Sequence, residues 1–128
     1  MTNVWGVHMG EQVGSRPIDE GYVAIGSDGL GDLRTFKDRD TIKAALLANN
    51  PDRKEAAVRV VAGIAYRFAN EMKAGDVVIY PSKHNRMVNI GQFTGEASFE
   101  PNDTDEYPNH RKVVWRGTFR ATISANRP

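Results

Sequence analysis

The residues of this chain that could cleave a phosphodiester bond are Asp52, Glu71 and Lys73. Pro51-Asp52 followed by Glu71-Met72-Lys73 spells the metal-binding pattern of many DNA-cleaving enzymes. That pattern needs Glu71 and Lys73 on a strand, so that both side chains point at one Mg²⁺. Here they end the most periodic helical segment of the chain, where side chains two residues apart diverge. The sequence therefore favours a helix end, with Lys73 complementing the helix dipole and Asp52 as a cap, over a nuclease centre.

Two other patterns fall short of a defined chemistry. Residues 26–31, Gly-Ser-Asp-Gly-Leu-Gly, follow a strand but match neither G-x-x-x-x-G-K-[ST] nor G-x-G-x-x-G, so a loop that lines a pocket is favoured over a nucleotide cradle. The histidines His8, His84 and His110 are far apart and have no paired carboxylate spacing, which argues against a metal site. We expect a binding domain with no catalytic residues, no metal and no cofactor.

Basic side chains point to an anionic partner. Lys83, His84 and Arg86 lie in a loop between two expected strands, and His110 precedes Arg111 and Lys112. His110 could contact a phosphate or simply begin a solvated strand. A local basic face and a scatter of solvated charges explain this distribution equally well.

Composition describes one ordinary domain. A chain of 128 residues can bury a sufficient core without cross-links such as disulfides. The lack of cysteine excludes disulfides, thiolate metal sites and cysteine nucleophiles. The formal net charge of +1 does not by itself indicate a nucleic-acid binder. No stretch approaches the roughly 18 apolar residues of a membrane span, and the N-terminus lacks the pattern of a secretion signal. We expect a soluble, cytoplasmic protein with no membrane partner.

Two helices are expected in the middle of the chain. Asp38 or Asp40 caps the first, which runs to about Leu47 and buries Ile42, Ala45 and Leu46. The second has the strongest periodicity, with one face packed on a sheet and formed by Ala57, Val61, Ile64, Ala65, Phe68 and Met72.

Strands are expected on both sides of this helical block. They span residues 4–8, 21–26, 77–80, 87–94 and about 112–123, with a short piece at 97–99 before an acidic loop over 100–109. Strands separated from a helical block predict an α+β fold with a curled, largely antiparallel sheet. Most aromatic residues must belong to its core, and Tyr107, in a polar loop, is the least core-like.

Five segments, taken in order, resemble the N-terminal domain of Mrr-like restriction endonucleases, which is similar to the PUA-like group that includes EVE and YTH domains. The segments are VWGVH, IGSDGLGDL, FANEMKAGDVVIYPS, NIGQFTG and HRKVVW, and the resemblance runs from Trp5 to about Phe119. It implies a curled sheet or partial barrel flanked by helices, with a pocket for a modified base that is swung out of a nucleic acid. On this basis residues 1–128 form a single domain that precedes, or was excised from, a nuclease domain.

Carried over by position, the resemblance implies where the base is held. By this carry-over the pocket contains His8, Met9, Gly26, Ser27 and Asp28, together with Phe99 or Tyr107, and we further predict Tyr80, Ser82 and Asn89 as pocket residues. Phosphates are predicted to meet Lys83, Arg86, His110 and Arg111. Relatives often have an aromatic residue, typically Trp, at the position of Ser27. Here either another aromatic residue supplies that wall of the cage, or the ligand is not a methylated base held by stacking.

The function expected from the sequence is recognition of a modified base in DNA, methylated cytosine or adenine, which targets an associated restriction nuclease. A flipped base needs stacking surfaces, hydrogen-bond partners and cations for the flanking phosphates, and these residues could supply all three. The alternative is a stand-alone PUA-like module that binds RNA or a small ligand.

Overall fold

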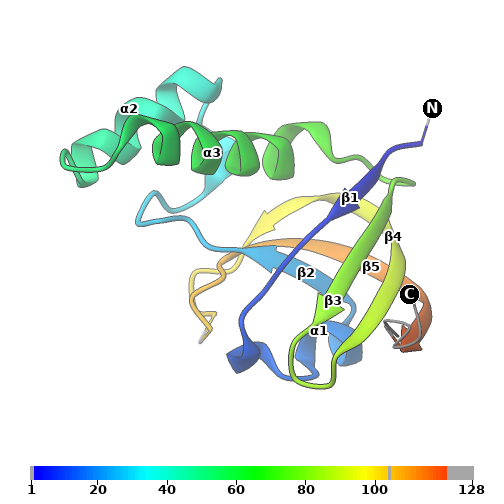
Figure 1. The fold of residues 1–128 in the computed structure, drawn as a ribbon. Coiled ribbons are helices and arrows are strands. Elements are labelled where there is room, and N and C mark those ends of the chain that lie inside the picture. The colour runs from blue at the N-terminus through cyan, green and yellow to red at the C-terminus, as the bar shows by residue number, and fades with distance from the viewer. Residues whose placement is uncertain (1, 104, 121–128) are drawn as a thin grey trace, which may run out of the picture.

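The fold is built on one five-stranded sheet. The structure, a computed structural model, describes residues 2–103 and 105–120. The strands are β1 (Val4–Gly6), β2 (Tyr22–Ile25), β3 (Val77–Ser82), β4 (Met87–Phe99) and β5 (Asn109–Arg120), in the order β1-β3-β4-β5-β2. β1 runs parallel to β3, and every other neighbouring pair is antiparallel. The sheet curls strongly, but its edge strands β1 and β2 do not pair, so these strands leave the barrel open (Figure 1).

Helices cover the two ends of the curled sheet (Figure 1). α2 (Arg39–Asn49) and α3 (Glu55–Tyr66) form a layer over one end, and the π-helical turn η3 (Arg67–Glu71) leads from α3 into β3. The 3-10 turn η1 (Glu11–Val13) and the short helix α1 (Arg16–Glu20) lie at the other end. A third short turn, η2 (Leu33–Thr35), follows the loop after β2. The predicted α+β class with a curled, largely antiparallel sheet is confirmed at this level.

Two apolar cores stabilise the two layers. The first fills the inside of the curled sheet and includes Val23, Phe68, Tyr80 and Phe93. The second joins α2, α3 and η2 through residues such as Leu33, Ile42, Leu46, Val58 and Ala62. Ile25, the last residue of β2, packs against both cores. The end of β2 is therefore the place where the sheet and the helical layer meet.

The first helix agrees with the sequence-based prediction. Asp38 is its N-cap, and Oδ1 accepts a hydrogen bond of 2.9 Å from the Thr41 backbone N–H while Thr41 Oγ1 accepts one from the Asp38 N–H. Ile42 and Leu46 are fully buried, as the periodicity predicts. This capping box satisfies two N–H groups that a helix start otherwise leaves unpaired.

The buried face of α3 was predicted in part. Ala65, Phe68 and Met72 are buried as expected, and Val61 packs against the second core. Ala57 is exposed and Ile64 is 45% exposed, whereas Val58 and Ala62, which were not predicted, are buried against α2. Only the residues of the helical end, Phe68 and Met72, reach the core of the sheet. The reason is that α3 packs on a helix, and that the wider π turn η3 then rotates the subsequent side chains towards the sheet.

Smaller differences concern the ends of elements. Asp52 does not cap α3, whose N-cap is Lys54, while Glu71 and Lys73 do end a helical segment as expected. The separate piece at 97–99 is the end of β4, which continues through a register break between Phe93 and Ala97. The last strand begins at Asn109 instead of Lys112, and its predicted end at Ile123 lies outside the described residues.

Candidate functional site

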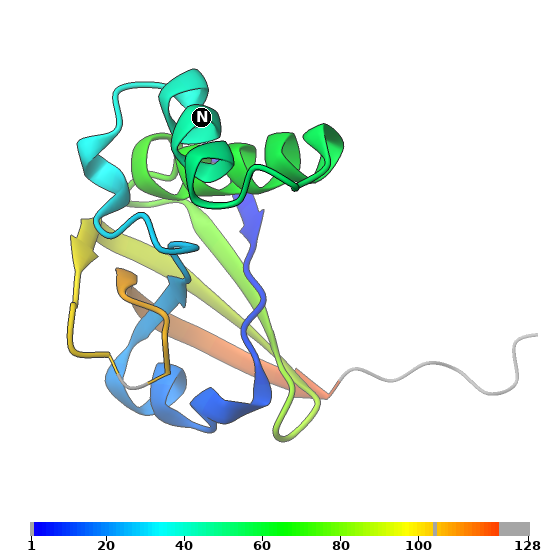
Figure 2. The ribbon, with the colours of Figure 1, turned by 90° about the vertical axis from the view of Figure 1, so that its left-hand side faces the viewer.

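A cavity of about 270 Å³ opens between the helical layer and the end of β2. We call it the interlayer cleft. The helices supply an apolar wall that consists of Ile42, Leu46, Val61, Ile64 and Ala65. The opposite wall comes from the chain after β2 and from one aromatic residue, and it consists of Ile25, Gly26, Ser27, Asp28, Leu30, Leu33 and Tyr107. Figure 2 shows this loop between the helices and the sheet.

The loop after β2 makes a tight turn at the mouth of the cleft. Leu30 N donates a hydrogen bond of 2.9 Å to Ser27 O, and Asp28 and Gly29 adopt φ angles of +50° and +84°. Aspartate is one of the few residues other than glycine that enter this left-handed region at modest cost. The turn leaves the Asp28 side chain exposed at the rim.

A guanidinium faces the Asp28 carboxylate across the rim. Arg53 lies in the turn between α2 and α3, and its Nη1 is 3.5 Å from Asp28 Oδ2. Both side chains are partly exposed, so water screens the pair and it contributes little to stability. The cleft is thus apolar inside, with one carboxylate and one guanidinium at its mouth.

Asn109 attaches the same loop to the sheet. Its side chain is 2% exposed, and it donates a hydrogen bond of 3.1 Å from Nδ2 to Gly31 O. Its Oδ1 accepts another of 3.1 Å from Leu33 N. Because both bonds tie backbone groups of the loop to the first residue of β5, the cleft wall is attached to the rigid sheet.

Tyr107 is held at both ends. Its hydroxyl accepts a hydrogen bond of 2.9 Å from Gly10 N, and its backbone N donates to Asp103 Oδ1. The other oxygen of Asp103 lies 2.9 Å from His110 Nε2, and the His110 ring stacks on Tyr22 with centroids 4.4 Å apart. Tyr107 is therefore a fixed wall of the cleft, in spite of its place in a polar loop.

Four of the predicted pocket residues meet in the interlayer cleft, namely Gly26, Ser27, Asp28 and Tyr107. The structure does not bring the others into its lining. His8 is exposed and Met9 is buried in the core of the sheet, although the next residue, Gly10, contacts the Tyr107 hydroxyl. Phe99 is half-buried at the end of β4, where it pairs with Asn109.

Tyr80, Ser82 and Asn89 lie within the sheet. Asn89 Nδ2 donates to Tyr80 O at 2.9 Å and to Ser82 Oγ at 3.0 Å, and Thr118 Oγ1 donates to Asn89 Oδ1 at 2.9 Å. This network ties β3, β4 and β5 together and occupies the side-chain polar groups of Ser82 and Asn89 that were predicted to face a base. Burial raises the pKa of Tyr80, whose hydroxyl has no hydrogen-bond partner among the described residues.

The predicted phosphate-binding residues are divided between two places. Lys83 and Arg86 are exposed in the turn between β3 and β4. His110 and Arg111 pair with Ser98 and Ala97 at the opposite end of β4. They do not form one basic rim, and the His110 ring nitrogen already faces a carboxylate.

Sequence reasoning missed Arg53, Asn109 and Ile64 as components of the site. Ile64 was assigned to a core face because its spacing fits one, and only the packing of α3 on α2 leaves it at the cleft. Asn109 falls at the end of the predicted acidic loop and shows no pattern that separates it from other polar loop residues. Arg53 becomes a rim residue only through the turn between the helices.

Metal clusters and membrane spans are both absent from the described part of the chain. No group of three or more His, Asp or Glu side chains there could hold a metal ion. No helix in that part is long and apolar enough to cross a membrane.

Fold and site together define an α+β domain with an open, curled sheet and an apolar cleft beneath a pair of helices. The chain belongs to the family described as Domain of unknown function (DUF8426), whose model matches residues 5–126. None of the curated proteins compared with the chain matches it, and no solved structure does.

Proposed function

We propose that the chain is a DNA-binding domain that holds a modified base, swung out of its strand, in the interlayer cleft and thereby targets an associated restriction nuclease. The observation that carries the proposal is the meeting of Gly26, Ser27, Asp28 and Tyr107 on one cavity. The resemblance to PUA-like domains implies the same segment after β2 as a base-binding element.

The chemistry of the cleft suits a methylated nucleobase. Its helical wall offers Leu46, Val61 and Ile64 to the faces and methyl group of a ring. Ser27 and Asp28 offer the polar groups that such pockets use to fix the orientation of a ligand. The Asp28 carboxylate accepts hydrogen bonds only, so it selects an edge that donates, such as an exocyclic amino group.

Charge around the mouth favours one direction of approach. In the loop before β5 the exposed carboxylate of Glu106 repels phosphates, while Asp103 and Asp105 are largely buried beside His110 and Arg16. Arg53 and Lys54 lie just before α3. A strand that reaches the cleft therefore runs along the helical side. With few cations near the mouth, affinity for unmodified DNA is low and the base contributes most of the selectivity.

A second candidate is a stand-alone module that binds RNA or a small apolar ligand. The apolar helical wall favours this candidate, because Asp28 is the single charged residue of the lining. Competition separates the two: a single-stranded RNA or an apolar ring that displaces modified duplex DNA promotes the second.

The test is the ratio of affinities for matched modified and unmodified oligonucleotides, measured by fluorescence anisotropy at two salt concentrations. Asp28→Asn is expected to lower this ratio about tenfold, because it replaces an ionic acceptor by a neutral amide. Asparagine tolerates the left-handed backbone of this position, so the turn is kept. Asp52→Asn, an equal charge change in an exposed turn outside the cleft, is the control and should leave the ratio unchanged. Equal, undetectable binding of all oligonucleotides by the unmodified chain would refute the proposal.

A further inference from the structure

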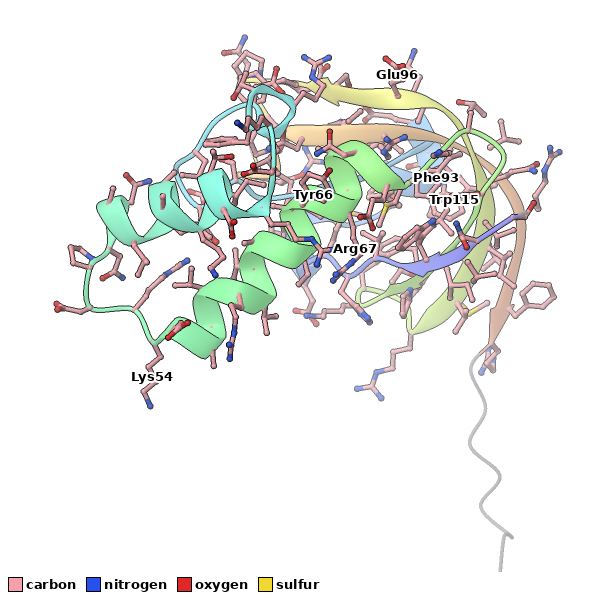
Figure 3. The ribbon with its side chains drawn as sticks, turned by 90° about the horizontal axis from the view of Figure 1, so that it is seen from above. Lys54, Tyr66, Arg67, Phe93, Glu96 and Trp115 are labelled. Carbon is pink, nitrogen blue, oxygen red and sulfur yellow. The ribbon has the colours of Figure 1, made fainter. Side chains whose placement is uncertain are left out.

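A second cavity, of about 560 Å³, lies between η3 and the end of β4. We call it the Arg111 cavity. Its lining includes Arg34, Asn70, Lys73, Glu96 and Arg111. η2 separates it from the interlayer cleft, because Leu33 lines the cleft and Arg34 lines the cavity. Figure 3 shows Glu96 beyond the end of α3 that carries Tyr66, on the far side of the molecule from Lys54.

Arg111 is a buried cation with an incomplete set of partners. It is 3% exposed, and its Nε and Nη1 donate hydrogen bonds of 2.7 Å to Phe68 O and Gly95 O. Its guanidinium carbon lies 5.6 Å above the centre of the Phe93 ring. Within residues 2–103 and 105–120, Nη2 has no hydrogen-bond acceptor and no carboxylate lies within 4.0 Å of the group.

A buried guanidinium without a carboxylate in direct contact is unfavourable. Burial lowers the pKa of Arg111, the more distant carboxylates of Glu96 and Asp76 act in the opposite direction, and the guanidinium remains charged at neutral pH. Two backbone carbonyls compensate part of the lost hydration, and they explain why the side chain is oriented as it is. They supply no negative charge, so an anion in the cavity would complete the site.

The other lining residues add positive charge. Lys73 is exposed directly after η3, and Arg34 donates from Nη1 to Ala97 O at 3.2 Å while it pairs with Asp32. Glu96 is the single carboxylate among the lining residues, against three cations. A guanidinium presents paired N–H groups that match two oxygens of a phosphate, and an ammonium adds a point charge.

We propose that the Arg111 cavity binds a phosphate group through Arg111 Nη2 and Lys73, with Arg34 at its edge. The phosphate belongs to inorganic phosphate, to a nucleotide or to a nucleic-acid strand, and these sources share the chemistry that the cavity recognises. This proposal does not depend on base binding in the interlayer cleft.

The test is a titration of the ¹⁵N-labelled chain followed by NMR, at constant ionic strength set with chloride. Three probes are used in parallel: inorganic phosphate, adenosine 5′-monophosphate, and a short oligonucleotide without a terminal phosphate. We expect saturable shifts of the Arg111 side-chain Nε–H and of the Gly95 and Ala97 amides. Binding of the first two probes identifies a phosphate monoester, and binding of the oligonucleotide alone identifies a strand.

Point variants test which residues bind the phosphate. Arg111→Met tests the buried cation directly, and Lys73→Ala keeps the test decisive if that variant fails to fold, since the Lys73 side chain is exposed. Lys73→Ala is expected to weaken binding about tenfold. Lys112→Ala, on the opposite face of β5, is the matched control, and Asp28→Asn should leave phosphate binding unchanged. The absence of a saturable shift at Arg111 with all three probes, or equal weakening by Lys73→Ala and Lys112→Ala, would overturn the proposal.

Discussion

Asp76 ties the N-terminal strand to the beginning of β3. Its Oδ2 accepts a hydrogen bond of 2.9 Å from Trp5 Nε1 and one of 3.1 Å from Lys73 N, and its Oδ1 accepts one of 3.2 Å from Asn3 N. The residue is 5% exposed. Burial by itself raises the pKa of Asp76, but the three hydrogen bonds outweigh it and the pKa is lowered. The ionised carboxylate is therefore the form that the fold stabilises.

This gives Asp76 a defined pH dependence. Because its folded-state pKa is depressed, its contribution to stability is complete above the ordinary carboxyl pKa of about 4 and is lost as the pH falls through the folded-state value. We expect Asp76→Asn to lower the free energy of unfolding in urea by about 2 kcal/mol at pH 7. The difference from the unmodified chain should shrink when both are measured near pH 3. Asp52→Asn serves as the control, and an unchanged difference at the two pH values would contradict this account.

Asn109 and Tyr107 hold one wall of the interlayer cleft in place. Asn109 holds the loop after β2 through two backbone groups, and Tyr107 is fixed by Gly10 and Asp103. The wall formed by the loop after β2 and by Tyr107 is thus attached to the sheet and not to the helices. The helical wall is the part of the cleft that can adjust to a ligand.

α3 is the element that gives the cleft its apolar wall. Its buried face meets α2, and Val60 and Ile64, one turn apart on the same side of the helix, remain 61% and 45% exposed. Ile64 lines the interlayer cleft and Val60 does not. An exposed aliphatic side chain beside an apolar cavity is where a ligand would gain buried area.

The two positions on α3 form a matched pair for a test. Ile64→Trp should fill the cleft and lower affinity for a modified oligonucleotide at least tenfold, whereas Val60→Trp should leave affinity within twofold. Both substitutions are at exposed positions of one helix, so we expect changes in unfolding free energy of about 0.5 kcal/mol or less. Calorimetric titration measures the affinity of each variant, and urea unfolding measures its unfolding free energy. Equal affinities of the two variants would place the ligand outside the cleft.

The elements also show what periodicity can predict. α2 was predictable because Asp38 and Thr41 form a local capping box and its apolar spacing is regular. The buried face of α3 was predictable only in part, because nearly every position from Ala56 to Ala65 is apolar or small and several faces fit a spacing of three and four. The π turn η3 and the break in β4 at Phe93 depend on tertiary contacts and leave no local signal.

The whole molecule consists of two layers with separate cores that meet at Ile25. The segment after β2 was recognisable as a pocket loop from its glycines, and it lines the cleft as expected. The helical wall of the cleft could not be predicted, because the cleft exists only where the helical layer and the sheet separate. Tyr80, Ser82 and Asn89 illustrate the converse. Polar and aromatic types on strands suit a site, but here Ser82 and Asn89 bond to each other within the sheet and Tyr80 is buried in its core.

The arrangement in layers predicts unequal local stability. α2 is covered mainly by α3, while β4 and β5 pair with each other along most of their length. We expect backbone amides of α2 to exchange hydrogen faster than those at the centres of β4 and β5, because the helical layer opens without the sheet. Leu46→Ala, which removes a fully buried side chain from the second core, should destabilise this layer by about 3 kcal/mol and widen the difference.

A ligand between the layers should reverse this difference. At a free concentration of about 100 times its Kd, a modified oligonucleotide bound in the interlayer cleft should slow exchange in α2 by up to about a hundredfold, since opening the layer requires its release. A ligand bound in the Arg111 cavity alone contacts η3 and β4 and should protect those segments in preference to α2. Hydrogen exchange followed by NMR therefore distinguishes the two sites in one experiment. Uniform exchange in α2 and the sheet, with or without ligand, would show that the domain opens only as a single unit.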